Sequence, residues 1–271
     1  MIELMLVPLT AALLILVMHA YLGIHIIARG VIFVDLALAQ VAAMGYTIAT
    51  LMGFAPGSVP GYLLSVGATL FGALLLSFSR LDHERVPQEA LIGVVFVAAS
   101  AATILLAAQS PQGSEHVEEL LTGTLLWVTW PEIARTALIY AVVGVVHWFL
   151  RKRFFTISLD PDRATAEGWR LRWWDFVFYG LFGITVTSAV GIAGVLVVFS
   201  FLVIPAVIAF MFAARPLPLL FISLGVGTLA TLAGLALSFR FDLPTGPLVV
   251  CVFALTLVIA LVIRATRRAV R

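Results

Sequence analysis

The amino-acid sequence predicts an all-α, polytopic membrane protein. Of its 271 residues, 62% are hydrophobic and 11% are charged, whereas soluble domains are about 45–50% apolar and about 25% charged. The mean hydropathy of +1.14 points the same way. Several apolar runs reach the ~20 residues that a helix needs to cross a bilayer. We therefore expect one transmembrane domain over residues 1–271 and no separate soluble domain.

Nine apolar runs are predicted to span the membrane, within a range of eight to ten. They lie at residues 5–28, 31–54, 60–80, 89–109, 131–150, 175–190, 192–213, 217–238 and 243–264. Only a break near Gly191 and Gly194 separates the sixth run from the seventh. A shorter apolar stretch at 119–128 is too brief to cross and is expected to be re-entrant or interfacial.

The long polar passage at residues 151–175 is predicted to be a cytoplasmic loop that contains a short helix. Asp160 suits the N-cap, Pro161 the first helical position, and Gly168 the left-handed residue beyond the end. About two turns are not stable alone in water, so we expect this helix to dock on another subunit. The docking residues would be Asp160, Pro161, Asp162, Ala164, Ala166, Glu167 and Gly168.

The basic residues predict how the chain is oriented, because Lys and Arg gather in cytoplasmic loops. With residues 151–175 in the cytoplasm, only Arg135 and Arg240 of the sixteen Lys and Arg residues lie outside. The N-terminus is then outside and the C-terminus is cytoplasmic. The outer loop after the fourth span carries His116 among acidic residues, Glu115, Glu118 and Glu119. This loop could gather cations, or it could be a solvated or docking surface.

Ionisable side chains inside the membrane are costly, so each is a candidate for function. Asp35 is the only carboxylate well inside a predicted span, and His25 lies at a similar depth on the preceding span. His19 and Gln40 lie deeper, roughly ten residues from the intervening turn at about 1.5 Å per residue. These four residues are predicted to line a substrate pathway, with Asp35 and His25 as metal ligands.

Helix geometry leaves structural alternatives open for the same residues. Asp35 and Gln40 lie about 140° apart around a straight helix, and His19 and His25 about 120° apart, so neither pair faces one ion. Asp35 could instead pair with His25 or with Arg29 as a structural lock. His147, near the inner end of its span, is expected to snorkel toward the interface.

The sequence contains no common catalytic signature. Its single lysine, Lys152, follows Arg151 rather than glycine, so the chain has no G-x-x-x-x-G-K-[ST] loop for ATP. It has neither an H-E-x-x-H nor a G-x-S-x-G motif. One cysteine, Cys251, cannot form an internal disulfide or a cysteine metal site. We therefore expect no enzyme activity, no cofactor bound by this chain and no nucleic-acid partner.

The sequence resembles the zinc/manganese/iron-type metal ABC transporter permeases, whose fold is that of a type II ABC importer-like permease. The resemblance runs through Gly23–Gly30, Val34–Gly45, Asp160–Gly168, Gly194–Val198, Leu202–Ala206 and Asp242–Pro247. Family members usually carry a glycine–aspartate pair on the second helix and a histidine one turn later. Here Val34 precedes Asp35, and Ala39 stands where the histidine is expected.

The resemblance implies a homodimer around a central pathway in a bacterial inner membrane. Two ATP-binding subunits would engage the short helix at residues 160–168 and use the ATP. An extracellular or periplasmic metal-binding protein would deliver a divalent metal, zinc or manganese or else ferrous iron. Three alternatives stay open: an ABC permease for a metal chelate or cofactor, a stand-alone secondary transporter with Asp35 as its coupling carboxylate, and a non-transporting membrane scaffold.

Overall fold

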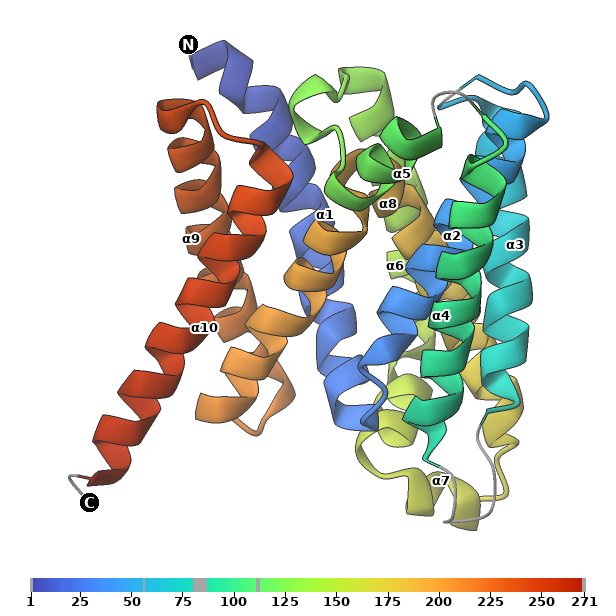
Figure 1. Cartoon of the computed structure of the whole chain (residues 1–271). Helices are drawn as coiled ribbons and strands as arrows, with labels where there is room; N and C mark the ends of the chain where they lie inside the picture. Colours follow the sequence, from blue (N-terminus) through green and yellow to red (C-terminus); the bar gives the residue numbers. More distant parts are fainter. Residues whose placement is uncertain (1, 56, 80–86, 111–112, 270–271) are drawn as a thin grey trace.

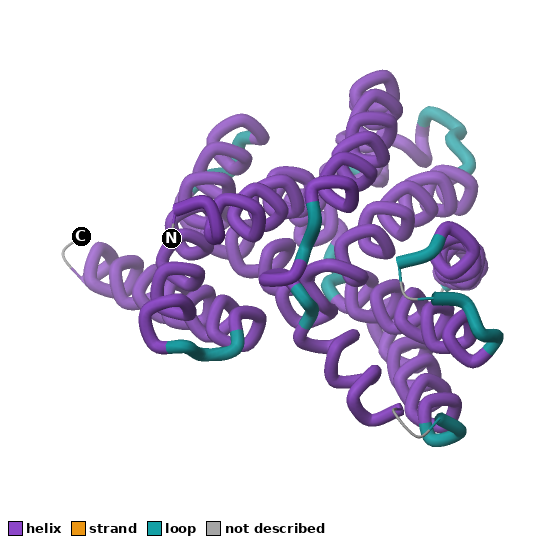
Figure 2. The backbone as a smooth tube through the Cα atoms, turned by 90° about the horizontal axis from the view of Figure 1, so that it is seen from above, coloured by secondary structure: helices purple, strands orange, loops and turns teal. Residues whose placement is uncertain are grey.

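The computed structural model describes residues 2–55, 57–79, 87–110 and 113–269. All regular structure in these ranges is helical (Figures 1 and 2). The long helices are α1 (Ile2–Arg29), α2 (Phe33–Leu51), α3 (Val59–Ser77), α4 (Gln88–Ala107), α6 (Trp130–Leu159), α8 (Leu171–Phe212), α9 (Pro216–Phe241) and α10 (Thr245–Ala269). The short ones are α5 (Gly113–Thr122), η1 (Leu125–Trp127) and α7 (Pro161–Ala166).

Eight helices in the described ranges are long and apolar enough to cross a membrane, which confirms a polytopic helical protein. One of them, α8, has 42 residues, about twice what one crossing needs. Its backbone leaves the helical conformation at Gly194, where φ is 76° and ψ is 160°. The predicted sixth and seventh spans are therefore the two segments of α8, and the break falls at one of the two predicted glycines.

The two segments of α8 run in opposite directions. Asp175, near the start of the first segment, binds the last residue of α1. Gly194 lies against Gly123 at the opposite end of the bundle. Ala209, near the end of the second segment, packs with Ile24 and so returns to the first end. α8 is thus a helical hairpin that passes through the bundle twice, as its path in Figure 1 also shows.

Gly194 and Gly123 meet backbone to backbone at the tip of this hairpin. Both have positive φ, 76° and 77°, and a Cβ on either would overlap the main chain of the other. Beside them, the Thr124 N–H donates to the Ile192 carbonyl at 3.0 Å. This contact holds the apolar stretch at 119–128 at one end of the bundle, so it does not cross, as expected.

The bundle has two different ends. The N-terminus and α5 lie at one end, and α7 and the C-terminus lie at the other (Figure 1). Seen from above, the two termini lie toward the same side of the bundle (Figure 2). We call these ends the α5 end and the α7 end. Of the basic residues that predict the orientation, Arg80, Arg85 and Arg271 lie outside the described residues.

The polar loop at residues 151–175 is shorter than predicted. Helices α6 and α8 extend into it from both sides and leave only residues 160–170 between them. In the extension of α6, Phe154 and Ile157 are buried, whereas Arg151 is exposed. The chain keeps one apolar face past the end of the apolar run, and this face lets the helix continue into polar surroundings.

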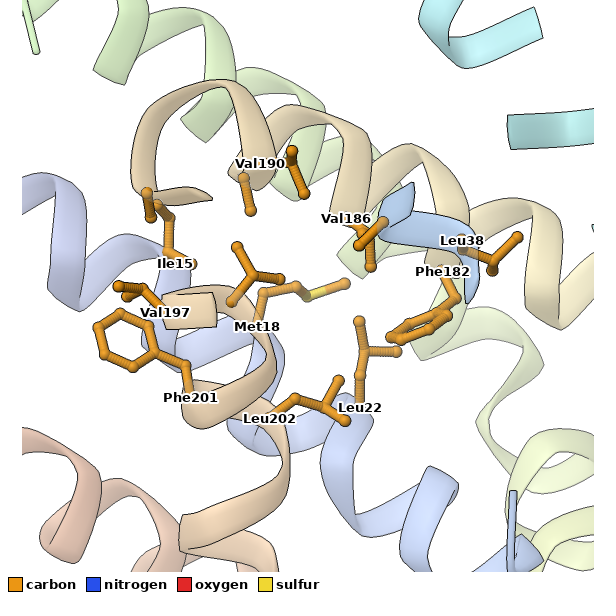
Figure 3. Packing of buried hydrophobic residues seen from close by; sticks show 14 of the residues in the cluster. Ile15, Met18, Leu22, Leu38, Phe182, Val186, Val190, Val197, Phe201 and Leu202 are labelled. Carbon is orange, nitrogen blue, oxygen red and sulfur yellow. The ribbon is translucent and has the colours of Figure 1, made fainter. Parts of the chain in front are cut away.

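The core lies where the α8 hairpin closes around α1 (Figure 3). α1 contributes Ile15, Met18 and Leu22, and α2 contributes Leu38. The labelled side chains from the two segments of α8 are Phe182, Val186, Val190, Val197, Phe201 and Leu202. Because α1 is enclosed in this way, its polar residues are held inside the bundle.

Candidate functional site

Asp35 is a carboxylate that the fold buries inside the bundle. It lies in the first turn of α2 and its side chain is 0% exposed. Neither of its oxygens has a partner within the part of the chain that the structure describes. An ionised carboxylate is strongly penalised in such surroundings unless another group compensates it. A carboxylate kept there is the kind of group that cation and proton pathways use.

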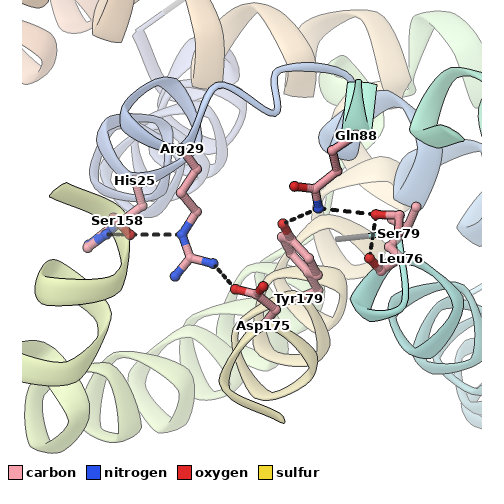
Figure 4. A network of polar contacts seen from close by, with 8 residues as sticks. All are labelled: His25, Arg29, Leu76, Ser79, Gln88, Ser158, Asp175 and Tyr179. Carbon is pink, nitrogen blue, oxygen red and sulfur yellow. Dashed lines mark hydrogen bonds and ion pairs between the residues drawn. The ribbon is translucent and has the colours of Figure 1, made fainter. Parts of the chain in front are cut away.

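Arg29, the last residue of α1, is the centre of a buried polar network at the α7 end (Figure 4). Its Nη1 donates to Asp175 Oδ1 at 2.9 Å, and its Nε donates to Ser158 Oγ at 2.8 Å. The Arg29 and Asp175 side chains are 1% and 0% exposed. The guanidinium carbon also lies 3.9 Å from the centre of the Phe178 ring. The network ties α1 to α6 and α8, the two helices that flank α7.

Two histidines lie beside this network. His25 Nδ1 is 3.0 Å from Ser158 Oγ, the same hydroxyl that Arg29 contacts. His147 is only 2% exposed and its Nδ1 lies 3.3 Å from the Tyr21 hydroxyl, so the prediction that it snorkels is wrong. In the described part of the chain, Nε2 of both histidines lacks a hydrogen-bond partner. Aromatic rings, among them Tyr21, surround both imidazoles.

The alternative in which Asp35 pairs with His25 or Arg29 as a structural lock is wrong. Arg29 binds Asp175 instead, and His25 contacts Ser158. The sequence did hold a signal, because Arg29 and Asp175 have opposite charges and lie at the same predicted end of their spans. Among the described residues, no group of three or more His, Cys, Asp or Glu side chains is placed to hold a metal. The metal role of Asp35 and His25 stays a prediction.

His19 and Gln40 lie deeper, on α1 and α2. His19 Nδ1 is 2.8 Å from the Ile15 carbonyl oxygen. Because a carbonyl only accepts hydrogen bonds, Nδ1 carries the proton and the lone pair of the neutral ring is on Nε2. That nitrogen has no partner in the described ranges, and Gln40 is 8% exposed. His19 therefore presents an unpaired imidazole nitrogen inside the bundle, the kind of atom that binds transition metals.

α7 has the capping residues that the sequence predicts. Asp160 Oδ1 accepts from the Arg163 N–H at 3.1 Å, and Pro161 is the first helical residue. Gly168, just beyond the end, has φ of 76°. These contacts satisfy free backbone groups at the helix start and allow the chain to turn away at its end. α7 is therefore a preformed element of the chain.

α7 is anchored on one side and exposed on the other. Ala164 is 0% exposed, so it packs against the chain itself. Arg163 Nε donates to Glu167 Oε1 at 2.9 Å on the exposed side, and this bond raises the pKa of Arg163. The exposed members of the predicted docking set are Asp160, Pro161, Asp162, Ala166, Glu167 and Gly168. Ala164 alone of that set serves internal packing.

At the α5 end, α5 and the end of α2 line a polar cavity of about 230 Å³. His116 lies in this cavity together with Glu115, Glu119 and Thr50. Burial lowers the pKa of His116, and the nearby Glu119 opposes that shift. A neutral imidazole beside carboxylates fits the predicted cation-gathering loop, and the exposed glutamates equally fit a solvated or docking surface. Both readings stay predictions.

Comparison with known proteins identifies the family. Residues 1–264 match the model of the ABC 3 transport family. The chain belongs to this family. It is 25% identical to the manganese transport system membrane protein MntB of Synechocystis sp., over 90% of this chain and 77% of that protein. It is 24% identical to the chelated iron transport system membrane protein YfeD of Yersinia pestis, over 91% of this chain and 80% of the relative.

The fold of this chain is similar to that of a solved structure. PsaBC from Streptococcus pneumoniae, solved in complex with Fab, superposes with a TM-score of 0.78 at 19% identity. The match covers 94% of this chain and 89% of the other. Together with the family match, this confirms the predicted resemblance to metal-type ABC transporter permeases and the predicted all-α permease fold.

Proposed function

We propose that this chain is the membrane-spanning subunit of an ATP-driven importer for a divalent transition metal, zinc, manganese or ferrous iron. Two copies would enclose a central pathway. An ATP-binding subunit would dock at the α7 end, and an extracellular or periplasmic metal-binding protein would dock at the α5 end. The N-terminus is then outside the cell and the C-terminus is cytoplasmic, as the basic residues of the α7 end favour.

The observation that carries the metal part of this proposal is Asp35. It is fully buried in α2, within a membrane span, and both of its oxygens lack partners in the described part of the chain. His19 supports it with an unpaired nitrogen at mid-span. Carboxylate oxygen and imidazole nitrogen are ligands that zinc, manganese and ferrous iron share, so the ligand types do not choose among these ions.

The Arg29 network suggests how ATP hydrolysis in the partner reaches the pathway. α7 is joined directly to α6 and α8, and Arg29 ties the adjoining ends of those helices to α1 through Ser158 and Asp175. A push on α7 therefore moves the end of α1 together with the start of α8. α1 carries His19 and His25, so the same movement shifts the predicted pathway residues and alternates access between the two sides.

A permease for a metal chelate is the second candidate. The relative from Yersinia pestis is named for chelated iron. Ala39 also occupies the position of the expected histidine, and the described residues hold no cluster of three potential metal ligands. A chelate brings its own ligands and does not need such a cluster. Asp35 would then have a structural or gating role.

Partner docking is tested by substituting the exposed Ala166. We expect Ala166→Trp to remove the co-purifying ATP-binding subunit while the permease stays folded, because the bulky ring would stand on the exposed side of α7. Ala214→Trp is the matched control, since Ala214 is also exposed at the α7 end but lies in the turn before α9. Retention of the subunit by Ala166→Trp, or equal loss in both variants, would contradict docking at α7.

Substrate class is tested by uptake into vesicles that contain the permease and its ATP-binding subunit. Zinc, manganese and ferrous ions are supplied free or chelated, with and without ATP. ATP-dependent uptake of a free ion supports the main proposal, and uptake of the chelate alone supports the second candidate. Full-rate uptake by the permease without its partner, driven by an ion gradient, would establish a secondary transporter instead.

A further inference from the structure

Three arginines lie where α8, α9 and α10 approach the α7 end. Arg264 and Arg267 are in the last turns of α10, and Arg215 is in the turn between α8 and α9. Arg215 and Arg267 are exposed, and Arg264 is half-buried. The Arg267 guanidinium carbon lies 5.8 Å from the ring centre of Phe212, the last residue of α8. We call Arg215, Arg264 and Arg267 the α10 basic group.

The sequence around the α10 basic group contains almost no acidic residue. Residues 176–241 and 243–271 have neither Asp nor Glu, and Asp242 is at the opposite end of α9. In the described part of the chain, no ion pair involves any of the three arginines. The acidic helix α7 lies across the bundle from the end of α10, and so do α3 and α4, which stand on either side of residues 80–86 in the sequence (Figure 1). We therefore expect the opposite charge to come from another molecule.

The α10 basic group lies where a membrane span ends. The candidate span of α10 runs from Thr245 to Arg267. The turn before Arg264 exposes apolar side chains, among them Leu261 and Ile263, which are 47% and 42% exposed. Arginine beside apolar residues at the end of a span buries its methylene groups and extends its charged group toward the head groups. The arginines are therefore at the depth of lipid phosphates.

We propose that the α10 basic group binds the head group of an anionic phospholipid. Guanidinium groups favour phosphate because their planar fork donates two parallel hydrogen bonds. A zwitterionic lipid offers the same phosphate but adds a positive charge of its own, so an anionic lipid is preferred. A lipid fits better than a soluble subunit does, because Arg264 lies inside the span and the exposed Leu261 and Ile263 beside it require an apolar neighbour.

The test places a fluorophore beside the α10 basic group in the full-length chain in vesicles. The variant Cys251→Ser with Ala265→Cys carries the label on the exposed position 265. Nitroxide-labelled phosphatidylglycerol and phosphatidylcholine are compared as quenchers. We expect phosphatidylglycerol to quench this label preferentially, by about fivefold for each arginine that reaches the head group. A label on the exposed Cys251, about 20 Å further along α10, should show no preference.

Arg267→Gln is expected to lower the preference at position 265 by about fivefold, and Arg267→Lys is expected to keep most of it. Added salt should reduce the preference, because Arg267 is exposed. Arg240→Gln is the matched control, since Arg240 is also exposed but lies in the last turn of α9, at the α5 end. A preference that survives in Arg240→Gln and falls in Arg267→Gln supports the lipid site.

Three results would overturn the proposal. The first is equal quenching of the label at position 265 by the two lipids. The second is an equal loss of preference in Arg267→Gln and Arg240→Gln, which would indicate general surface charge. The third is an unchanged lipid preference in Arg267→Gln together with weaker retention of the ATP-binding subunit, which would make the α10 basic group a protein contact. None of these results depends on metal transport.

Discussion

Two buried carboxylates, one at the start of α2 and one near the start of α8, have opposite surroundings. Asp175, on the first segment of α8, is 0% exposed and binds Arg29 at 2.9 Å. Asp35, in the first turn of α2, is equally buried, but neither oxygen has a partner in the described ranges. The same side chain at the same burial therefore has two different sets of contacts. Asp175 belongs to a lock between helices, whereas no hydrogen bond within the described part of the chain uses either oxygen of Asp35.

The contrast gives a way to separate structural from functional charges in a membrane bundle. A charge that the fold uses has hydrogen bonds to other residues of the chain, as Arg29 has to Ser158 and Asp175. A charge that the fold does not use lowers stability, and it is retained only if something other than folding needs it. Substitutions should therefore affect stability at Arg29 and Asp175, and transport at Asp35.

Asp175→Ala is expected to have the largest effect on stability. It removes a buried carboxylate partner of Arg29, and breaking such a pair costs about 3–5 kcal/mol. Unfolding of the purified permease in mixed detergent, followed by its helical signal, measures the change.

The double variant Arg29→Met with Asp175→Leu is the control for that measurement. It replaces both charges by apolar side chains, which is often close to neutral, so most of the lost stability should return. If the single and double variants unfold alike, the ion pair is not what holds these helix ends together.

Ser158→Ala is expected to have an intermediate effect. It removes the hydroxyl that Arg29 Nε and His25 Nδ1 share, and leaving buried polar groups without that partner costs about 1–3 kcal/mol. The same unfolding assay measures it. Thr156→Ala is a suitable control on α6, because the half-buried Thr156 hydroxyl donates to the Lys152 carbonyl of its own helix at 2.8 Å. Equal losses of stability in both variants would show that the contacts of Ser158 with Arg29 and His25 do not stabilise the fold.

Asp35→Asn is expected to have the smallest effect on stability and a large one on transport. The amide keeps the shape and removes the buried charge, so the permease should unfold at or above the wild-type denaturant concentration. ATP-driven metal uptake should be mostly lost. A stability loss as large as that of Asp175→Ala would show that Asp35 has a structural partner. Unchanged metal uptake would show that Asp35 does not line the transport pathway.

Local features of the fold could be predicted because they depend on neighbouring residues. Asp160, Pro161 and Gly168 specify the start and end of α7 within nine residues, and the structure has each in its expected place. Gly194 was one of two candidates for the break in α8, and the structure identifies it. The length of α6 was underestimated, because its apolar face continues through Phe154 and Ile157 after the apolar run has ended.

Pairings between distant residues could not be predicted in the same way. Asp35 was paired with His25 or Arg29 because they are close along the chain and similar in depth. Asp175 comes 146 residues after Arg29, and its proximity to Arg29 depends on α8 starting beside the end of α1. His147 was misplaced for a related reason, since its burial depends on Tyr21 of another helix.

The sequence by itself determined that this protein is a bundle of membrane spans, that α8 breaks near Gly191 and Gly194, and how α7 is capped. Each of these follows from hydrophobic length or from backbone preferences that act over a few residues. Only the tertiary structure decided which buried carboxylate is neutralised, because charge pairing depends on distances in space between separate helices. The hairpin of α8 brings Asp175 to Arg29 and leaves Asp35 alone among the described residues, and no local pattern contains that information.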